Sequence, residues 1–435
     1  MSTGGSPGAS GGVTATGGTV ASGGAVGSGG GAGRGGSGGM GGRGGAGEAG
    51  SMASGSGGVA ASGGHAGATG GRGGTSSGGG AGHAQTGGAS GSGGTPGTGG
   101  GTATGGSGAC TPPEASALVG WASMAGSGVT TTTGGGAAAP TTVTTLAAFN
   151  SAVAGTNAAV IWVKGSITGA MRVGSNKTIV GVCGAELHGH VEVNGSANVI
   201  IRNLKIVGYG VGDCSLDPGY DSSVGCSSGD DAMTVQKSSH HIWIDHCDIS
   251  DGTDGNLDIT NAANYVTVSW TKFHYTPRTD TQGSDSTGAA GHRFSNLVGG
   301  SDTASDSGTL NVTWHHDWWA DNVVERQPRV RFGKNHLFNN LWSSSASNYC
   351  VRAGIDAQIL VEASVFTGVK NPTQFNNTSD QQTAYITEMN NVFTGTSGAT
   401  ATGGGGTAFT NPPYAYTPDT TGGLQAAIQA GAGPH

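Results

Sequence analysis

The sequence predicts an all-β protein in which residues 109–435 form a parallel β-solenoid, preceded by a disordered segment in residues 1–108. The first observation is the composition of that segment, which contains 50 of the 91 glycines, no Leu, Ile, Phe, Tyr or Trp, and one acidic residue, Glu48. Such a segment cannot bury enough apolar surface to offset the entropy of folding. We therefore expect a flexible linker followed by a single folded domain.

The second observation is a repeat within the folded domain. Short β-branched and aromatic runs end 43, 24, 45, 24, 24 and 27 residues apart, which is one or two periods of roughly 23 residues. A β-sandwich would show turns every ~8–12 residues, whereas stacked coils of a solenoid produce this longer period. The runs end at Ile206, Ile249, Phe273, Trp318, Trp342, Phe366 and Phe393.

A second series of shorter strands lies between these runs, at residues 233–235, 257–259, 297–298, 330–332 and 351–352. Two interleaved series with one period predict two stacked sheets, and a third sheet can be fitted through the intervening turns. The pairs Asn339–Asn340 and Asn390–Asn391 suit either a side-chain ladder at a repeated bend or ordinary turns.

Charge excludes several classes of partner. Residues 109–435 contain 15 Lys and Arg against 25 Asp and Glu, without a basic stripe, which argues against nucleic acid and anionic membranes. We expect metal cations to be the charged partner. No run of 18 apolar residues is present, so we expect no membrane span.

Six cysteines without a CxxC pair indicate an oxidising compartment. We therefore expect a secreted, extracellular protein, although the residues after Met1 do not resemble a signal peptide. Cys214 and Cys226 share one loop and are the first candidates for a disulfide. Cys247 lies inside an apolar predicted strand and is predicted to be a small buried residue.

Three aspartates form the candidate metal site. Asp231 and Asp254 are 23 residues apart, so adjacent coils would place their carboxylates about 4.8 Å apart. Asp258 follows, and Gly255 allows a bend that brings the side chains together. Three close carboxylates repel unless a cation lies between them, and an all-oxygen set suits Ca²⁺. The alternatives are that they cap turns, or that Asp230 replaces Asp231.

Arginines are concentrated two coils further on. Arg326, Arg329 and Arg331 lie within six residues around a proline. On a strand, Arg329 and Arg331 share a face, and Arg326 at the preceding bend completes a positive wall. Arginine matches carboxylates in geometry, so Ca²⁺ beside guanidinium groups suits a substrate that bears several carboxylates. A solvated run of charges is the alternative.

These segments carry a family resemblance. Residues 243–247, 254–258, 265–270 and 326–333 resemble the pectate lyases of polysaccharide lyase family one, as do His336, Asn339–Asn340 and the upstream residues 175–181 and 198–203. The resemblance implies a right-handed, single-stranded parallel β-helix. It also implies calcium-assisted β-elimination of polygalacturonate, which gives 4,5-unsaturated products.

The resemblance also implies roles for individual residues. It assigns Asp231, Asp254 and Asp258 to the primary calcium ligands, Arg326 to the base that removes the C5 proton, and Arg331 to the substrate carboxylate. The usual lysine of the family is absent after Phe273, where a longer loop leaves Arg293 and Arg278 as candidates for its role.

Other classes of function share some of these features. A β-helix hydrolase would use paired acids without calcium, and a non-catalytic β-solenoid adhesin could share the repeat and the glycine-rich stalk. Pectin lyase, which acts on methylated chains, is disfavoured by the retained aspartates. We expect a monomer that acts on polygalacturonate.

Overall fold

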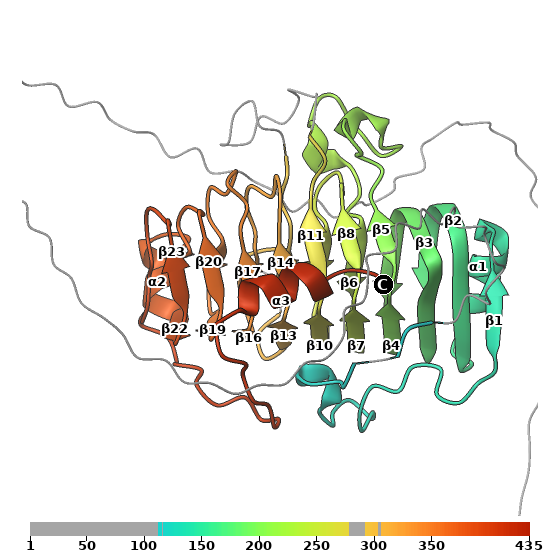
Figure 1. The fold of residues 1–435 in the computed structure, drawn as a ribbon, viewed down its shortest axis with the longest axis horizontal. Coiled ribbons are helices and arrows are strands. Elements are labelled where there is room, and N and C mark those ends of the chain that lie inside the picture. The colour runs from blue at the N-terminus through green and yellow to red at the C-terminus, as the bar shows by residue number, and fades with distance from the viewer. Residues whose placement is uncertain (1–111, 115, 278–291, 303–305) are drawn as a thin grey trace, which may run out of the picture. The chain divides into compact units, whose positions relative to one another are not determined.

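The structure is a computed structural model that describes residues 112–114, 116–277, 292–302 and 306–435. The predicted disordered segment, residues 1–108, lies outside the described residues. The described part is built almost entirely from parallel strands that stack coil upon coil (Figure 1). This is the parallel β-helix that the sequence predicts.

The described strands number 23 and fall into three stacked series, which we call sheets A, B and C. The long strands β2 (Ala159–Val173) and β3 (Lys177–Asn194) run through the series and join them. Sheet A also contains β1 (Pro140–Val143), β4 (Ala197–Arg202), β7 (His240–Asp245), β10 (Asn264–Ser269), β13 (Val312–His315), β16 (Lys334–Phe338), β19 (Gln358–Glu362) and β22 (Tyr385–Met389).

Sheets B and C contain the shorter strands. Sheet B contains β5 (Lys205–Val207), β8 (Asp248–Ser250), β11 (Lys272–His274), β14 (Trp318–Trp319), β17 (Leu341–Trp342), β20 (Val365–Thr367) and β23 (Val392–Thr394). Sheet C contains β6 (Met233–Gln236), β9 (Leu257–Ile259), β12 (Leu297–Val298), β15 (Arg329–Val330), β18 (Val351–Ala353) and β21 (Thr373–Phe375). The short predicted series is confirmed as sheet C. Each long predicted run divides at a bend into one strand of sheet A and one of sheet B, so the third sheet arises within the long runs and not from the intervening turns.

The pairing register confirms the predicted repeat with one correction. Ile249 pairs with Phe273, which lies 24 residues later, and Trp342 pairs with Phe366 at the same interval. Phe273, however, pairs with Trp319 and not with Trp318. Successive side chains of a strand point to opposite faces, so only one residue of the Trp pair can continue the interior series.

Aromatic rings fill the interior behind sheet B. Phe273, Trp319, Trp342 and Phe366 are fully buried, and each ring stacks on the next with centroid distances of 5.7, 4.8 and 4.1 Å. The planes of the last two pairs differ by only 3° and 2°. The rings at equivalent positions in consecutive coils thus form one continuous column in the core, which we call the aromatic column.

A hydrogen-bonded ladder follows the bend between sheets A and B. Backbone N–H groups of Thr271, Asp317, Asn340 and Ser364 each donate to the side chain one coil further on, at 2.8 to 3.1 Å. The last acceptor is Asn391. The ladder interpretation of the asparagine pairs therefore holds for their second members, which we include in the polar ladder defined by these five residues.

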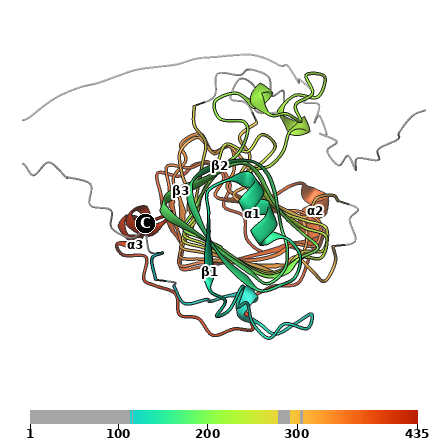
Figure 2. The same cartoon turned by 90° about the vertical axis from the view of Figure 1, so that its right-hand side faces the viewer.

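Helices lie at the ends and outside of the coils. Helix α1 (Leu146–Val153) lies across the N-terminal end, as the end-on view shows (Figure 2). Helix α2 (Thr378–Thr383) lies near the other end, and α3 (Leu424–Gly431) packs Leu424 and Ile428 against Leu341 and Val365. Short 3₁₀ turns are η1 (Trp121–Ser123), η2 (Cys214–Leu216) and η3 (Cys226–Ser228).

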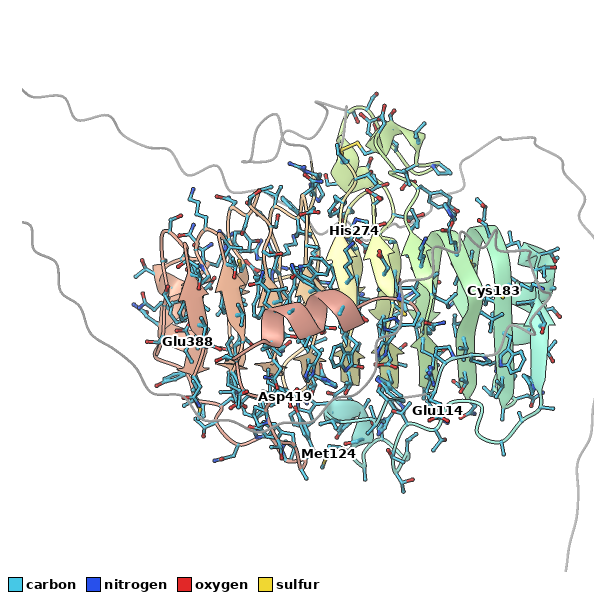
Figure 3. The ribbon with its side chains drawn as sticks, in the orientation of Figure 1. Glu114, Met124, Cys183, His274, Glu388 and Asp419 are labelled. Carbon is cyan, nitrogen blue, oxygen red and sulfur yellow. A yellow bond between two sulfur atoms is a disulfide. The ribbon has the colours of Figure 1, made fainter. Side chains whose placement is uncertain are left out.

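The cysteine predictions are confirmed where the structure describes them. Cys214 and Cys226 form a disulfide in the loop that projects beyond β8 and β11 (Figure 3). Cys247 is fully buried, and burial raises the pKa of its thiol to about 12. Among the described helices, none has the length and apolar character that a membrane crossing requires.

Candidate active site

Sheet C carries the predicted site residues on its outer face. Met233 and Val235 of β6 belong to the core, so Thr234 between them points outward. Thr234 pairs with Asp258 of β9. Two strands beyond β9 in the same sheet, Arg329 of β15 pairs with Arg352 of β18. The sheet therefore presents carboxylates over β6 and β9 and guanidinium groups over β15 and β18.

Asp231 and Asp258 converge beside Gly255. A Cβ atom added to Gly255 would lie 2.7 Å from Asp231 Oδ1 and 3.1 Å from Asp258 Oδ1, so a larger residue would occupy the space that both oxygens face. Asp258 Oδ1 accepts a hydrogen bond from the Leu297 backbone at 3.0 Å. Asp231 Oδ1 is buried and has no hydrogen-bond partner among the described residues.

Asp254 is held differently from the other two aspartates. Its Oδ1 lies 2.9 Å from Nε2 of His292, which is buried. The pairing of Thr234 with Asp258 makes the coil 24 residues long here, so Asp254 is not in register with Asp231 as the 23-residue spacing suggests. The sequence offered no signal for the role of His292, because the long preceding loop hides its register.

The electrostatics of the three carboxylates differ. Burial, followed by the charges of Asp258 and Asp254, raises the pKa of Asp231 well above its usual value. Burial also raises the pKa of Asp258 to about 7, against the opposing charge of Arg326. Burial would raise the pKa of Asp254 as well, but the hydrogen bond from His292 and the charges of His292 and Arg326 together outweigh burial, and that pKa is lowered. A cation between them would relieve this repulsion.

Asp230, the alternative to Asp231, is an exposed residue. Its side chain is not among the atoms nearest to Gly255, unlike those of Asp231 and Asp258. The geometry favours Asp231 as the member of the cluster. Asp230 contributes its backbone carbonyl instead, which accepts from the backbone N–H of Thr253 at 2.9 Å.

Arg326 lies at the bend before β15, with a positive φ of 58°. Its guanidinium group lies over the ring of Phe294, 4.6 Å from the centroid. Burial opposes the charged form of Arg326, but the nearby Asp254 and Asp258 outweigh burial and raise its pKa. The guanidinium group therefore compensates the carboxylates, which in turn stabilise its charged form.

The remaining arginines gather over β15 and β18. Burial, together with the charges of Arg331, Arg326 and Arg352, lowers the pKa of Arg329 to about 10, against the effect of Tyr349. Arg331 donates to Asp302 at 2.5 Å and to the Gly299 carbonyl at 2.7 Å.

Arg352 is a residue that the sequence reasoning missed. Its guanidinium carbon lies 3.5 Å from the Tyr349 ring centroid, and it pairs in register with Arg329. The signal that could have found it is its spacing of one coil after Arg329.

The two candidates for the missing lysine fall in different places. The Arg293 carbonyl accepts from the Val324 backbone at 2.9 Å, and the following Phe294 pairs with Glu325, next to Arg326. Arg293 therefore occupies the coil that precedes Arg326, as the sequence suggests. Arg278 lies outside the described residues.

The three aspartates are the candidate ligands of a metal ion. Within the described ranges, no group of three or more His, Cys, Asp or Glu side chains already has the arrangement of a metal centre. The residues nevertheless fit a calcium ion in their chemistry, because oxygen ligands converge at Gly255 and the buried Asp231 Oδ1 has no hydrogen-bond partner in the described part of the chain. Asp254, held by His292, is the member that departs from a ready-made site.

Comparison with known proteins settles the family. Residues 102–435 match the family described as pectate lyase. The chain belongs to this pectate lyase family. It is 38% identical over 300 residues to pectate lyase B of Colletotrichum gloeosporioides, covering 66% of this chain and 78% of that protein. It is 36% identical over 301 residues to pectate lyase A of Aspergillus niger, covering 66% and 79%.

Solved structures agree with the fold. The pectate lyase Bsp165PelA of Bacillus sp. N165, determined in complex with trigalacturonate, has a TM-score of 0.57 and 23% identity, and the match covers 73% of this chain and 99% of that one. As a member of the pectate lyase family, the chain is a polysaccharide lyase. The hydrolase and adhesin interpretations are therefore excluded.

Proposed function

We propose that this protein cleaves polygalacturonate by calcium-dependent β-elimination and releases 4,5-unsaturated oligogalacturonides. The observation that carries the proposal is the outer face of sheet C, where buried carboxylates with raised pKa values lie beside four arginines. The relatives named pectate lyase and the structural neighbour that holds trigalacturonate support the same substrate class.

The residues that would hold Ca²⁺ are Asp231, Asp254 and Asp258. When bound, calcium would withdraw charge from a substrate carboxylate and offset the carboxylates that keep the pKa of Arg326 high. Asp254 would exchange its contact with His292 for this role. The glycine at position 255 keeps the space beside Asp231 and Asp258 open.

Arg326 is the proposed base, and its neighbours are the proposed binding groups. Arg326, held at the bend over Phe294 and deprotonated to the neutral guanidine, would take the C5 proton of a galacturonate. A C4–C5 double bond would then form as the C4–O4 bond of the same residue breaks, so that O4 leaves with the neighbouring sugar. Arg329, Arg331, Arg293 and Arg278 would bind and orient substrate carboxylates through paired N–H donors. An arginine base implies an alkaline optimum, because guanidinium groups deprotonate only with difficulty.

The test is the ultraviolet absorbance of unsaturated products on polygalacturonate, with and without EDTA. Wild type should form them only when calcium is supplied. Asp258→Ala should lose activity at micromolar Ca²⁺ and keep its folded circular dichroism spectrum, because the stacked coils do not depend on a surface metal. Full activity of Asp258→Ala in EDTA would contradict the calcium mechanism.

Three further properties belong to the proposal. The catalytic domain spans residues 109–435, with residues 1–108 as a linker. The protein acts as a monomer. It acts outside the cell, and the Cys214–Cys226 disulfide supports this location because such bonds persist in oxidising compartments. Equal activity on fully methylated chains without calcium would instead favour a pectin lyase.

A further inference from the structure

The projecting loop before β6 contains a carboxylate that faces the protein. Asp217 is 4% exposed, although neighbouring loop residues are open to solvent. Its Oδ2 accepts from the Asp230 backbone at 2.8 Å, and its Oδ1 accepts from the Gly219 backbone at 2.7 Å. The first of these bonds spans thirteen residues, unlike the local contact of Asp213 with Ser215. Asp217 therefore fastens the middle of the loop to its C-terminal end.

The backbone that Asp217 holds is the backbone of the candidate metal site. The Asp230 carbonyl accepts from the N–H groups of Thr253 and Asp254, at 2.9 and 3.4 Å. The next residue is Asp231, whose carbonyl accepts from Nδ1 of His190 at 2.7 Å. Asp230 thus connects Asp217 to the main chain of two of the three aspartates.

Tight packing around Asp217 restricts movement of its contact with Asp230. A Cβ added to Gly229 would lie 2.7 Å from Asp217 Oδ2 and would also collide with the side chain of Thr253. Thr253 is fully buried and directly precedes Asp254. The Cys214–Cys226 disulfide closes the loop on both sides of Asp217.

We infer that Asp217 is a positioning residue that sets calcium affinity by holding Asp231 and Asp254 in place. The inference rests on the proposed function. Like charges at the site repel, and without a clamp on the main chain the empty site would relax by moving them apart. Calcium binding would then have to restore the geometry, which weakens affinity. Groups that orient metal ligands typically change affinity by ~10–100-fold when removed.

The experiment is calorimetric titration of Ca²⁺ into the full-length protein without substrate. Asp217→Asn keeps the shape of the side chain but replaces one acceptor with a donor, so we expect weaker calcium binding, on the order of 10-fold. At saturating Ca²⁺, kcat should return to within about twofold of wild type, because Asp217 does not contact the reacting groups. Glu186→Gln is the matched control, since Glu186 accepts from His188 and Lys205 on sheet B.

Each outcome of the titration and the kinetics either supports or contradicts the positioning role of Asp217. Unchanged calcium affinity in Asp217→Asn, or a fall in kcat that saturating calcium does not restore, would overturn the inference and leave the proposed function intact. A wild type that binds no calcium would overturn both. Should Asp217→Asn unfold in EDTA, the double variant Cys214→Ser and Cys226→Ser loosens the same loop. It should weaken calcium binding in the same direction, and an unchanged affinity there would also contradict the inference.

Discussion

Two parts of the β-helix repeat the same kind of residue in consecutive coils, with opposite results. In the aromatic column and the polar ladder, repeated rings stack and repeated side-chain oxygens accept from the coil before. On the outer face of sheet C, repetition places carboxylates near carboxylates and Arg329 beside Arg352. Aromatic rings at this spacing attract one another and amides form hydrogen bonds, whereas like charges at the same spacing repel.

This difference distinguishes stability from function in a solenoid. Residues that satisfy one another across coils stabilise the stack. Residues that repel across coils persist because something else compensates them, here Arg326 and, on our proposal, calcium and substrate. Asp317 is the informative exception, because it is a carboxylate within the polar ladder and its Oδ2 lacks a partner among the described residues.

The largest effect is expected from a substitution that disrupts the aromatic column. Phe366 is fully buried between Trp342 and Phe393, at 4.1 and 5.1 Å. Phe366→Ala should lower the free energy of unfolding by about 3–5 kcal/mol, because it removes ring contacts and leaves a cavity. Urea denaturation measures this, and Phe366→Leu should lose clearly less. A loss below 1 kcal/mol would mean that the column does not stabilise the coils.

The next effect concerns chemistry on sheet C. Arg326→Lys should lower kcat by on the order of 10²-fold or more with little change in KM, because a base acts in the chemical step. Steady-state kinetics across alkaline pH, at saturating calcium, measures both constants. Calcium affinity of the variant serves as the control. Retention of most of kcat would exclude Arg326 as the base and direct attention to Arg293 or Arg278.

A smaller effect is expected at the binding arginines. Arg331→Lys keeps the charge but loses the paired donors, so KM should rise by about tenfold while kcat changes little. The same kinetics measure it, and comparison with Arg326→Lys separates binding from chemistry. If Arg331→Lys lowered kcat and left KM unchanged, the assignment of Arg331 to the substrate carboxylate would be wrong.

The polar ladder offers a stabilising substitution. Burial raises the pKa of Asp317 well above its usual value, so the folded protein binds this proton more tightly than the unfolded chain does. The stability that depends on this proton is therefore present below the unfolded pKa of about 3.9 and is lost as pH rises through the folded pKa. Near neutral pH, Asp317 therefore carries a cost.

Asp317→Asn should remove that cost. Asn340 and Asn391 donate to the carbonyls of Trp314 and Val361, three residues before the preceding ladder position, so an amide at 317 should reach the Val268 carbonyl. We expect a gain of about 1–2 kcal/mol at pH 7, shrinking towards pH 4. Thermal unfolding against pH measures it, with the ladder variant Asn340→Asp as the converse, which should be destabilised. A pH-independent difference would contradict this account.

The smallest effect is expected outside the β-helix. Residues 1–108 lack core-forming side chains, so their deletion should leave the thermal unfolding temperature and activity on soluble polygalacturonate nearly unchanged. Differential scanning calorimetry of both forms measures this. A shift of several degrees would show that the linker stabilises the domain.

Sequence reasoning predicted the regular part of the molecule because periodicity is local information. The recurrence of apolar ends reports coil length, and coil length predicts which residues stack, such as Trp342 on Phe366. It failed by one residue at Trp318, because the long loop before the strand has no fixed length in a repeat. The same loop concealed His292 as the partner of Asp254.

The sequence by itself determined the parallel β-helix and the acidic and basic segments on one sheet, and it named the disulfide of the loop only as a first candidate, which the structure then showed. Only the tertiary structure decided the electrostatics, because burial and distance set a pKa. Asp258, Asp254 and Asp231 are alike in sequence, yet their side chains differ in the fold. Asp258 Oδ1 accepts from Leu297, Asp254 Oδ1 lies against His292, and Asp231 Oδ1 has no hydrogen-bond partner among the described residues. The inward turn of Asp217 was also decided there, since its partner Asp230 is distant in sequence and adjacent only in the folded loop.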